Sequence, residues 1–206
     1  MKTFVKISTI TFVLAFACIS IQSPQRADAQ IHTVYNTSMP SVIRVAIRPF
    51  NNPFGPIEYV QTVGFREYCE DVLPNEWMPS WNTESLRAGA IAIKMFAWYH
   101  TLHPVTTEGW TYDVDNTTNF QEYKYKSGRP RTDRVVRETW NLVYAPPSGE
   151  IRPLNYRAGF PHSPNWQFVG ADLMAQWGSE YWSRIARLTY PQVLRLYYPG
   201  HTLRGI

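Results

Sequence analysis

Glu76 is the residue of this sequence whose surroundings best suit acid–base chemistry. It stands in the segment 74–81, PNEWMPSW, which sets one carboxylate between two prolines and two tryptophans. A carboxyl group packed against tryptophan has a raised pKa because burial disfavours its charged form, and a general acid near neutral pH needs that condition. A nearby cation would lower the same pKa. The alternative interpretation is a proline-punctuated connection between two helices, in which Glu76 forms a salt bridge or occupies a first turn.

The segment after Glu76 predicts a helix that would hold it in place. Asn82 or Thr83 supplies the N-cap, and residues 86–97, LRAGAIAIKMFA, are apolar on nearly every side. That pattern is typical of a helix buried inside a domain. Its two cations, Arg87 and Lys94, project from one face, about two turns apart at roughly 3.6 residues per turn.

Composition indicates a single folded domain with a short leader. The chain has 206 residues, of which 44% are hydrophobic and 17% charged, enough for a core and too few charges for a disordered chain. The net charge is +4 without any basic run, so we expect no nucleic-acid partner. A mild positive field suits an anionic cell wall. The 8 Trp and 13 Tyr serve a core, and they also suit a cleft that stacks on sugar rings.

Residues 1–29 have the pattern of a secretory signal peptide. Two lysines are followed by the apolar residues 7–21 and then by an A-x-A cleavage site at 27–29. The apolar run is shorter than a typical transmembrane helix. The alternatives are a lipoprotein acylated at Cys18, whose preceding residues make a poor lipobox, and an uncleaved anchor. We favour export with cleavage, which predicts a protein that is secreted or held in the cell envelope.

The mature chain is predicted to consist of a flexible segment, 30–40, and one domain, 41–206. Cys69 is then the one cysteine left. An internal disulfide and a metal site with several thiolates are therefore excluded. We interpret Cys69 as a small apolar residue of a packed helix rather than as a nucleophile.

The rest of the chain alternates short strands with helices. A helix is expected to stop before Pro74, because proline breaks a helix interior. A turn at 146–149, PPSG, is expected to separate two strands. The predicted strands are 41–48, 58–63, 141–144 and 151–157, and the predicted helices are 65–72, 82–100 and 133–139; we expect loops at 51–56 and 100–107.

Residues 73–81 and 86–92 together resemble the opening motif of the SpoIID/LytB family. In that family a Glu-Met-Pro elbow precedes an alanine-rich helix that carries two basic residues. Here Trp77 is inserted between the glutamate and the Met-Pro pair. Further similarity follows in matching order at 41–48, 110–123, 173–178 and 189–200, so the resemblance extends over residues 41–206.

The chain departs from the family pattern in several loops. Asp115, Asn119 and Phe120 stand where zinc-binding members have their ligands, so we expect no metal and no other cofactor. The segment that begins at Tyr156 lacks the family's serine and paired glycines, and Ala175 replaces another serine. A His-Gly-x-Gly element that normally precedes 173–178 is absent.

The resemblance implies an α+β fold, a single domain with a buried central helix and mixed, largely antiparallel strands. It implies a lytic transglycosylase that cleaves peptidoglycan glycan strands between N-acetylmuramic acid and N-acetylglucosamine, in cell-wall or sporulation remodelling. Glu76 would be its catalytic acid/base. The candidate substrate-binding residues are Arg87, Lys94, Gln121, Tyr123, Tyr156 and Gln176.

Two other functions fit the sequence. One is a non-catalytic glycan-binding module that modifies a cell-wall amidase, with wall hydrolases as its partners, and the altered loops favour it. The other is a hydrolase, which needs a second carboxylate. Asp113, Asp115 and Asp172 are the candidates, although Asp113 and Asp115 also suit Asx turns.

Overall fold

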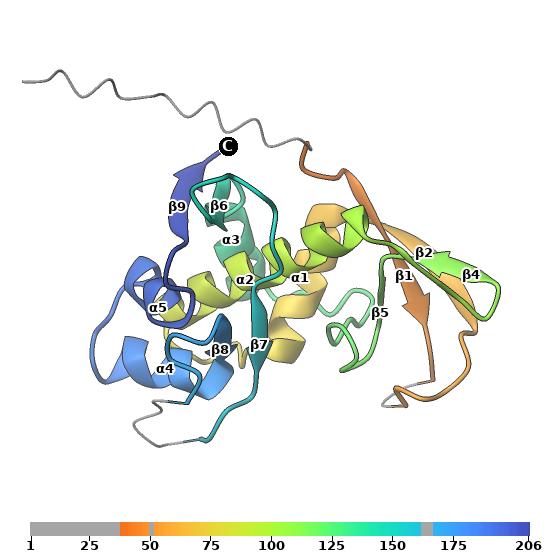
Figure 1. The fold of residues 1–206 in the computed structure, drawn as a ribbon. Helices are drawn as coiled ribbons and strands as arrows, with labels where there is room; N and C mark the ends of the chain where they lie inside the picture. The colour runs from red at the N-terminus through yellow and green to blue at the C-terminus, as the bar shows by residue number, and fades with distance from the viewer. Residues whose placement is uncertain (1–37, 50–51, 162–166) are drawn as a thin grey trace, which may run out of the picture. The chain divides into compact units, whose positions relative to one another are not determined.

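The helix α2 (Thr83–Leu102) runs through the middle of the fold, and every other helix of the described chain packs against it (Figure 1). The computed structural model describes residues 38–49, 52–161 and 167–206. The leader predicted at 1–29 and most of the segment 30–40 lie outside these residues. The side chain of Asn82 caps α2 by accepting a hydrogen bond of 2.9 Å from the Glu84 amide. The prediction of a buried central helix is confirmed.

The first sheet is built on the strand β1 (Val42–Ile47). It pairs antiparallel with β2 (Tyr59–Gly64) and parallel with the short β5 (Val114–Asp115), in the order β2-β1-β5. The parallel partner arrives after α2 has crossed the fold, as parallel pairing requires a long connection. This pairing places the segment that follows β5 beside the end of α1.

A hairpin of β3 (Val105–Thr107) and β4 (Trp110–Tyr112) occupies part of the segment expected to be a loop. Its two turn residues, Glu108 and Gly109, have φ of 53° and 78°. Two consecutive residues with positive φ match the twist of antiparallel strands in a tight hairpin. The helix before it also extends beyond the expected end at residue 100.

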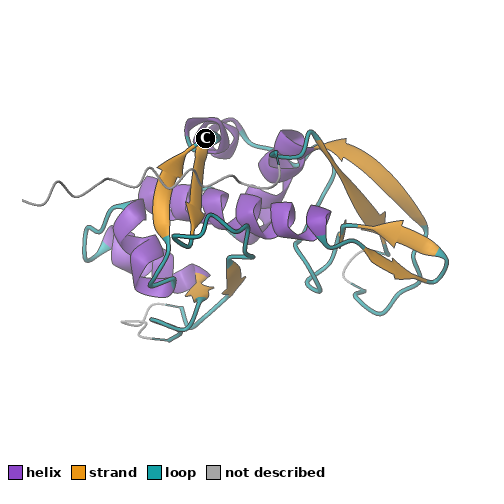
Figure 2. Ribbon diagram, turned by 45° about the horizontal axis from the view of Figure 1, so that its top comes forward, coloured by secondary structure: helices purple, strands orange, loops and turns teal. Residues whose placement is uncertain are grey.

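The two strands expected around the turn 146–149 both form but do not pair with each other. Instead β6 (Leu142–Ala145) pairs antiparallel with β9 (Thr202–Gly205), and β7 (Asn155–Arg157) pairs parallel with β8 (Leu173–Ala175). The strands lie in small groups around the helices (Figure 2). Of the five strand pairings in the described residues, three are antiparallel, which confirms the α+β class with largely antiparallel strands.

The helix α1 (Phe65–Glu76) does not stop before Pro74, so the expected end at residue 72 is wrong. Pro74 removes one helical N–H. The final turn is nonetheless held by the Trp77 amide, which donates to the Leu73 carbonyl at 2.8 Å, and by the Asn75 side chain, which donates to the Asp71 carbonyl at 2.6 Å. Glu76 is therefore the last residue of a helix.

The remaining helices are α3 (Pro130–Glu138), α4 (Gln176–Arg184) and α5 (Tyr190–Tyr197). Thr189 and Gln192 form a capping box at the start of α5, and Gly200, with φ of 94°, turns the chain out of it. Among the described residues, no helix has both the length and the apolar character needed to cross a membrane.

Candidate active site

Glu76 lies where α1 ends and the chain turns toward α2. Trp77 follows it in an extended conformation, with φ of −118°, and its indole ring is fully buried. The Glu76 side chain is half-buried. The helix end and the buried tryptophan together fix the position of this carboxyl group.

Two donors from distant segments converge on the Glu76 carboxyl group, and a third polar group acts on it. The Glu122 amide donates to Oε1 at 2.8 Å, and Nε2 of Gln176 donates to Oε2 at 2.9 Å. The third group is the Tyr156 hydroxyl, whose interaction with the carboxyl group lowers the pKa of Glu76. An ionised carboxylate has about four acceptor positions, so at least one remains for a substrate group.

Burial raises the pKa of the Glu76 carboxyl above its ordinary value. The hydrogen bonds from the Glu122 amide and from Gln176 oppose that rise, as does the one from Tyr156, because they favour the ionised form. The negative charge of the Glu122 side chain raises the pKa further. A carboxyl group with a raised pKa and donors ready for its ionised form suits a residue that gives and then regains a proton.

A buried chain of polar groups fixes the Tyr156 hydroxyl. Nε2 of Gln121 donates to this hydroxyl at 3.0 Å, and Oε1 of Gln121 accepts from the Tyr68 hydroxyl at 3.0 Å. Because Tyr156 accepts from Gln121, its own proton is available to interact with Glu76, whose pKa the hydroxyl lowers. Gln121 is fully buried, so the structure places it behind the site as an orienting group rather than on its surface.

The inserted Trp77 packs against the central helix at Gly89. A Cβ atom at Gly89 would lie 2.6 Å from Cδ2 of the Trp77 ring, so no side chain fits there. On its other sides the ring contacts Tyr156 edge-on, with centroids 4.9 Å apart, and Nε1 donates to Ser179 Oγ at 3.1 Å. The insertion therefore joins α1, α2, α4 and β7 directly beside Glu76.

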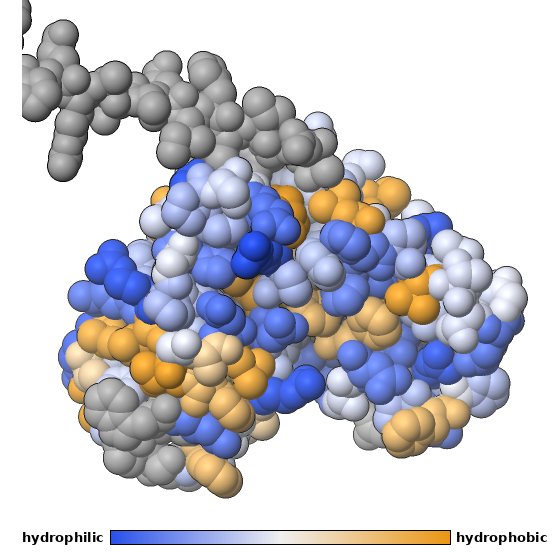
Figure 3. Space-filling view, in the orientation of Figure 1, coloured by the Kyte–Doolittle hydropathy of each residue, from blue (hydrophilic) through white to orange (hydrophobic). Residues whose placement is uncertain are grey.

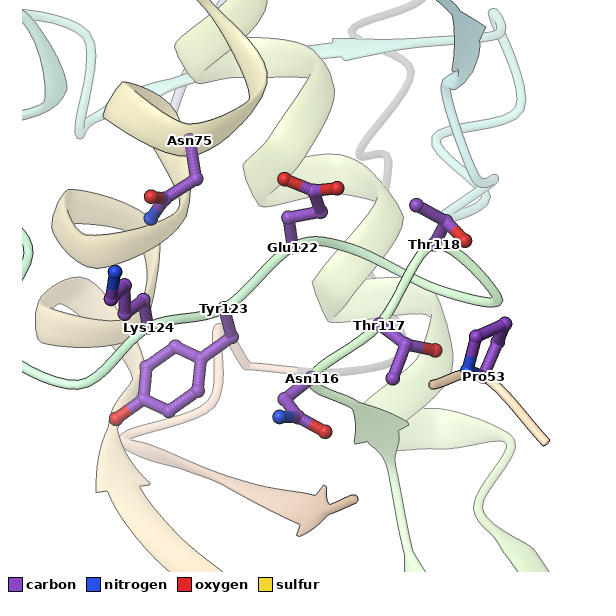
Figure 4. A pocket seen from close by; sticks show the side chains of 8 residues that line it. All are labelled: Pro53, Asn75, Asn116, Thr117, Thr118, Glu122, Tyr123 and Lys124. Carbon is purple, nitrogen blue, oxygen red and sulfur yellow. The ribbon is translucent and has the colours of Figure 1, made fainter. Parts of the chain in front are cut away.

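A polar cavity of about 330 Å³ opens beside the Glu122 segment (Figure 4). Asn75 from the end of α1, Pro53 from the β1–β2 loop and the segment 116–124 surround it. The residues that line it are Pro53, Asn75, Asn116, Thr117, Thr118, Glu122, Tyr123 and Lys124. Amides and hydroxyls in this arrangement suit the hydroxyl and acetamido groups of a sugar.

A larger groove of about 1100 Å³ lies between the elbow after Glu76 and α4. Trp81 and Trp177 form a tilted ring pair in its wall, with centroids 4.8 Å apart, and Met78 and Ile185 are exposed in it. Figure 3 shows apolar surface gathered at the end of the molecule where α4 and α5 lie. Since Gln176 precedes Trp177, this groove begins next to the carboxyl site.

The structure brings four of the predicted site residues together. Two others, Arg87 and Lys94, form contacts away from Glu76. Glu76, Gln121, Tyr156 and Gln176 form the network described above. The guanidinium group of Arg87 instead pairs with Glu84 and with Glu138, the latter at 2.9 Å. The Lys94 ammonium is buried and donates to the main-chain carbonyls of Thr139, Trp140 and Leu142, at the end of α3.

Tyr123 borders the cavity from a buried position. Its ring stacks on Tyr68, with centroids 5.3 Å apart, and no described residue pairs with its buried hydroxyl. The structure thus places Tyr123 in the cavity wall, one residue beyond Glu122 and separate from the hydrogen bonds to Glu76.

Two of the three aspartates considered for a hydrolase are occupied by other contacts, whereas the third, Asp172, is exposed. Asp113 is buried and forms an ion pair with Arg44 at 2.6 Å. Asp115 is buried too; it pairs with Arg48 at 3.2 Å and accepts from the Thr117 amide at 2.9 Å, which is the Asx-turn role expected for one of them. At the positions of the family's zinc ligands, Asn119 donates to the Pro53 carbonyl at 2.8 Å. Across the described ranges, no group of three metal-binding side chains forms.

The sequence prediction missed Glu122, whose amide contacts the carboxyl of Glu76. The signal was present, because Gln121 and Tyr123 were both singled out and Glu122 lies between them. Glu122 is the half-buried member of these three residues, and it lines the cavity together with Tyr123.

Comparison with known proteins finds similarity over part of the chain. Residues 55–145 match the family model described as SpoIID, stage II sporulation protein, which confirms the resemblance over these residues and supports a protein related to sporulation and the cell wall. The matched segment contains Glu76, Gln121 and Glu122, whereas Tyr156 and Gln176 lie beyond it.

The chain is also similar to an uncharacterized protein of Brachyspira hyodysenteriae (strain ATCC 49526 / WA1). The two share 39% identity over 67 residues, which cover 32% of this chain and 18% of that protein. The chain therefore matches only a small part of this relative's length.

Proposed function

We propose that this protein is a lytic transglycosylase that cleaves peptidoglycan glycan strands, with Glu76 as its single acid/base. The observation that carries the proposal is the Glu76 carboxyl group itself. Burial raises its pKa, while hydrogen bonds from the Glu122 amide and from Gln176 favour its ionised form. The match to the SpoIID model supports a cell-wall role, and the signal-like leader supports action outside the cytoplasm.

In the first step the protonated Glu76 carboxyl donates its proton to the glycosidic oxygen between N-acetylmuramic acid and N-acetylglucosamine. The bond from C1 to that oxygen breaks, N-acetylglucosamine leaves with a free hydroxyl group, and positive charge develops on the muramic acid ring. The Glu76 carboxylate formed in this step is stabilised by the Glu122 amide and by the Gln176 and Tyr156 side chains.

In the second step the Glu76 carboxylate accepts the proton of the C6 hydroxyl group of the muramic acid. The freed oxygen attacks C1 and closes a 1,6-anhydro ring, and Glu76 regains its starting proton. No water is consumed, so no second carboxylate is needed to activate one. This scheme agrees with the ion pairs of Asp113 and Asp115, which leave neither free to act as a base.

The test is mass spectrometry of denuded glycan strands incubated with the mature protein and with Glu76→Gln. We expect anhydro-ended fragments from the wild type, and a loss of at least about 100-fold in the variant. Glu150→Gln is the matched control, because Glu150 is exposed and forms its ion pair with Arg152 on a surface turn. Thermal melting of all three proteins separates loss of chemistry from loss of folding.

Other products would overturn the proposal in distinct ways. Fragments with free reducing ends would indicate a hydrolase. An absence of fragments from the wild type, with glycan binding that survives Glu76→Gln, would indicate the non-catalytic module that modifies a wall amidase.

A further inference from the structure

Glu122 contacts Glu76 through its main chain and presents its side chain to the adjoining cavity. The amide donates to Glu76 Oε1 at 2.8 Å, and the side chain is among those that line the polar cavity (Figure 4). One residue therefore both contacts Glu76 and lines the cavity next to it.

The Glu122 carboxyl group differs from the other acidic side chains near the site. Asp113 and Asp115 are buried in ion pairs with Arg44 and Arg48. Glu122 is half-buried, and within the described ranges no hydrogen bond or ion pair engages its side chain. A carboxylate that is partly withdrawn from water and not neutralised by a cation exerts a strong local field.

We propose that Glu122 is a second carboxylate of the active site, whose side chain faces the sugar and whose negative charge stabilises the positive charge that develops on the ring. This inference rests on the proposed transglycosylase. In it Glu122 makes no covalent bond and transfers no proton; it acts through its charge alone. Stabilisation of a charge that exists only in the transition state increases kcat more than it changes KM.

Glu122 also acts on Glu76, in two opposite directions. Burial is the main cause of the raised pKa of Glu76; the Glu122 amide lowers that pKa by hydrogen bonding, and the Glu122 charge raises it. A substitution of the side chain removes the charge but leaves the amide in place. The two effects of this residue can therefore be separated by experiment.

Several other polar groups surround the Glu76 and Glu122 carboxyl groups. Asn75 extends from α1, Gln176 from α4 and Tyr156 from β7, and the segment 116–124 contributes the remainder. The titratable members of this set are Tyr123, Tyr156 and Lys124. Burial holds the pKa values of both tyrosines well above neutral pH, so neither hydroxyl ionises where Glu76 does.

The experiment compares wild type, Glu122→Gln, Glu122→Asp and the control Glu150→Gln in the mature protein. We expect Glu122→Gln to lower kcat roughly 10- to 100-fold with little change in KM. The alkaline limb of its pH–rate profile should move to lower pH, because Glu76 loses a like charge that favours its protonated form. Glu122→Asp retains the charge, so its kcat and the alkaline limb of its pH–rate profile should stay close to those of the wild type. A purely structural role would not depend on charge.

A second measurement does not depend on turnover. Carbon-13 NMR titration of the Glu76 carboxyl group should show a lower pKa in Glu122→Gln than in the wild type and in Glu150→Gln. If the wild type releases no fragments, the proposed transglycosylase fails, and this titration alone decides whether the charge of Glu122 acts on Glu76.

Two results would overturn the role of Glu122. One is a Glu122→Gln enzyme with unchanged kcat and an unchanged Glu76 titration, which would show that solvent screens this carboxylate. The other is the release of reducing ends by the wild type and not by Glu122→Gln, which would make Glu122 the base that activates water in a hydrolase.

Discussion

The side-chain amide of Gln176 binds two oxygen atoms of Glu76, a residue 100 positions earlier in the sequence. Its Nε2 donates to the main-chain carbonyl at 2.7 Å and to the carboxyl Oε2 at 2.9 Å. Gln176 is the first residue of α4, so the start of one helix is attached to the end of another. The carboxyl group is thereby fixed relative to its own main chain.

Gln176→Leu should shift the pH dependence of the reaction in the direction opposite to Glu122→Gln. The lost hydrogen bond favours ionised Glu76, so the pKa of Glu76 rises and the protonated, active acid persists to higher pH. We expect kcat to fall about tenfold or more, because the carboxyl group loses its clamp. The pH profile of kcat/KM measures both effects, and an alkaline limb that stays in place would contradict this role.

Tyr156→Phe and Tyr68→Phe form a pair that separates stability from acidity. Each removes one hydroxyl from the buried Gln121 network, so each should lower the free energy of unfolding by about 1–3 kcal/mol. The Tyr156 hydroxyl alone reaches Glu76, so Tyr156→Phe alone should move the alkaline limb, and toward higher pH. Urea unfolding measures the stability, and pH–rate profiles measure the position of the alkaline limb. An alkaline limb that shifts equally in both variants would refute the contact between Tyr156 and Glu76.

Patterns that involve near neighbours in the sequence predicted much of this fold. The cap at Asn82, the buried helix α2 and the strand β1 follow from side-chain type and spacing. The pairing of β6 with β9, rather than with β7, was not predictable in this way. Partners some 60 residues apart are chosen by packing around α2, and no turn signal records that choice.

The candidate site shows the same division between local and distant information. Glu76 was identified from its proline and tryptophan neighbours, and Gln176 from a motif. Lys94 shows what the sequence could not decide, because a cation on a helix can bind a substrate or donate to main-chain carbonyls equally well. Its partners lie about 45 residues away at the end of α3, and this position depends on how two helices pack.

Gly89→Ala should displace Trp77 and with it Glu76. The added Cβ would lie 2.6 Å and 2.7 Å from two atoms of the indole ring, and overpacking of this kind costs about 1–3 kcal/mol. Because Trp77 follows Glu76 directly, kcat should fall even at temperatures at which the variant remains folded. Gly205→Ala is the matched control, since its Cβ would meet nothing closer than 3.9 Å. Equal stability of the two variants in urea unfolding would contradict the tight packing.

Lys94→Met and Arg87→Met test whether the two cations of α2 serve the fold or the substrate. Lys94 donates to carbonyls at the end of α3, where a cation also stabilises the helix dipole, so its loss should cost about 1–3 kcal/mol of unfolding free energy. Arg87 is partly exposed in its ion pairs, and its loss should cost at most about 1 kcal/mol.

Neither cation contacts Glu76, so KM for glycan strands should remain within about twofold in both variants when they are assayed well below their melting temperatures. A folded Lys94→Met protein whose KM rises about tenfold would show that the ammonium reaches the substrate. It would then have to leave three carbonyls of the α3–β6 connection, and hydrogen exchange of that connection would increase when glycan binds to the wild type. Unchanged exchange together with unchanged KM would assign Lys94 to the fold alone.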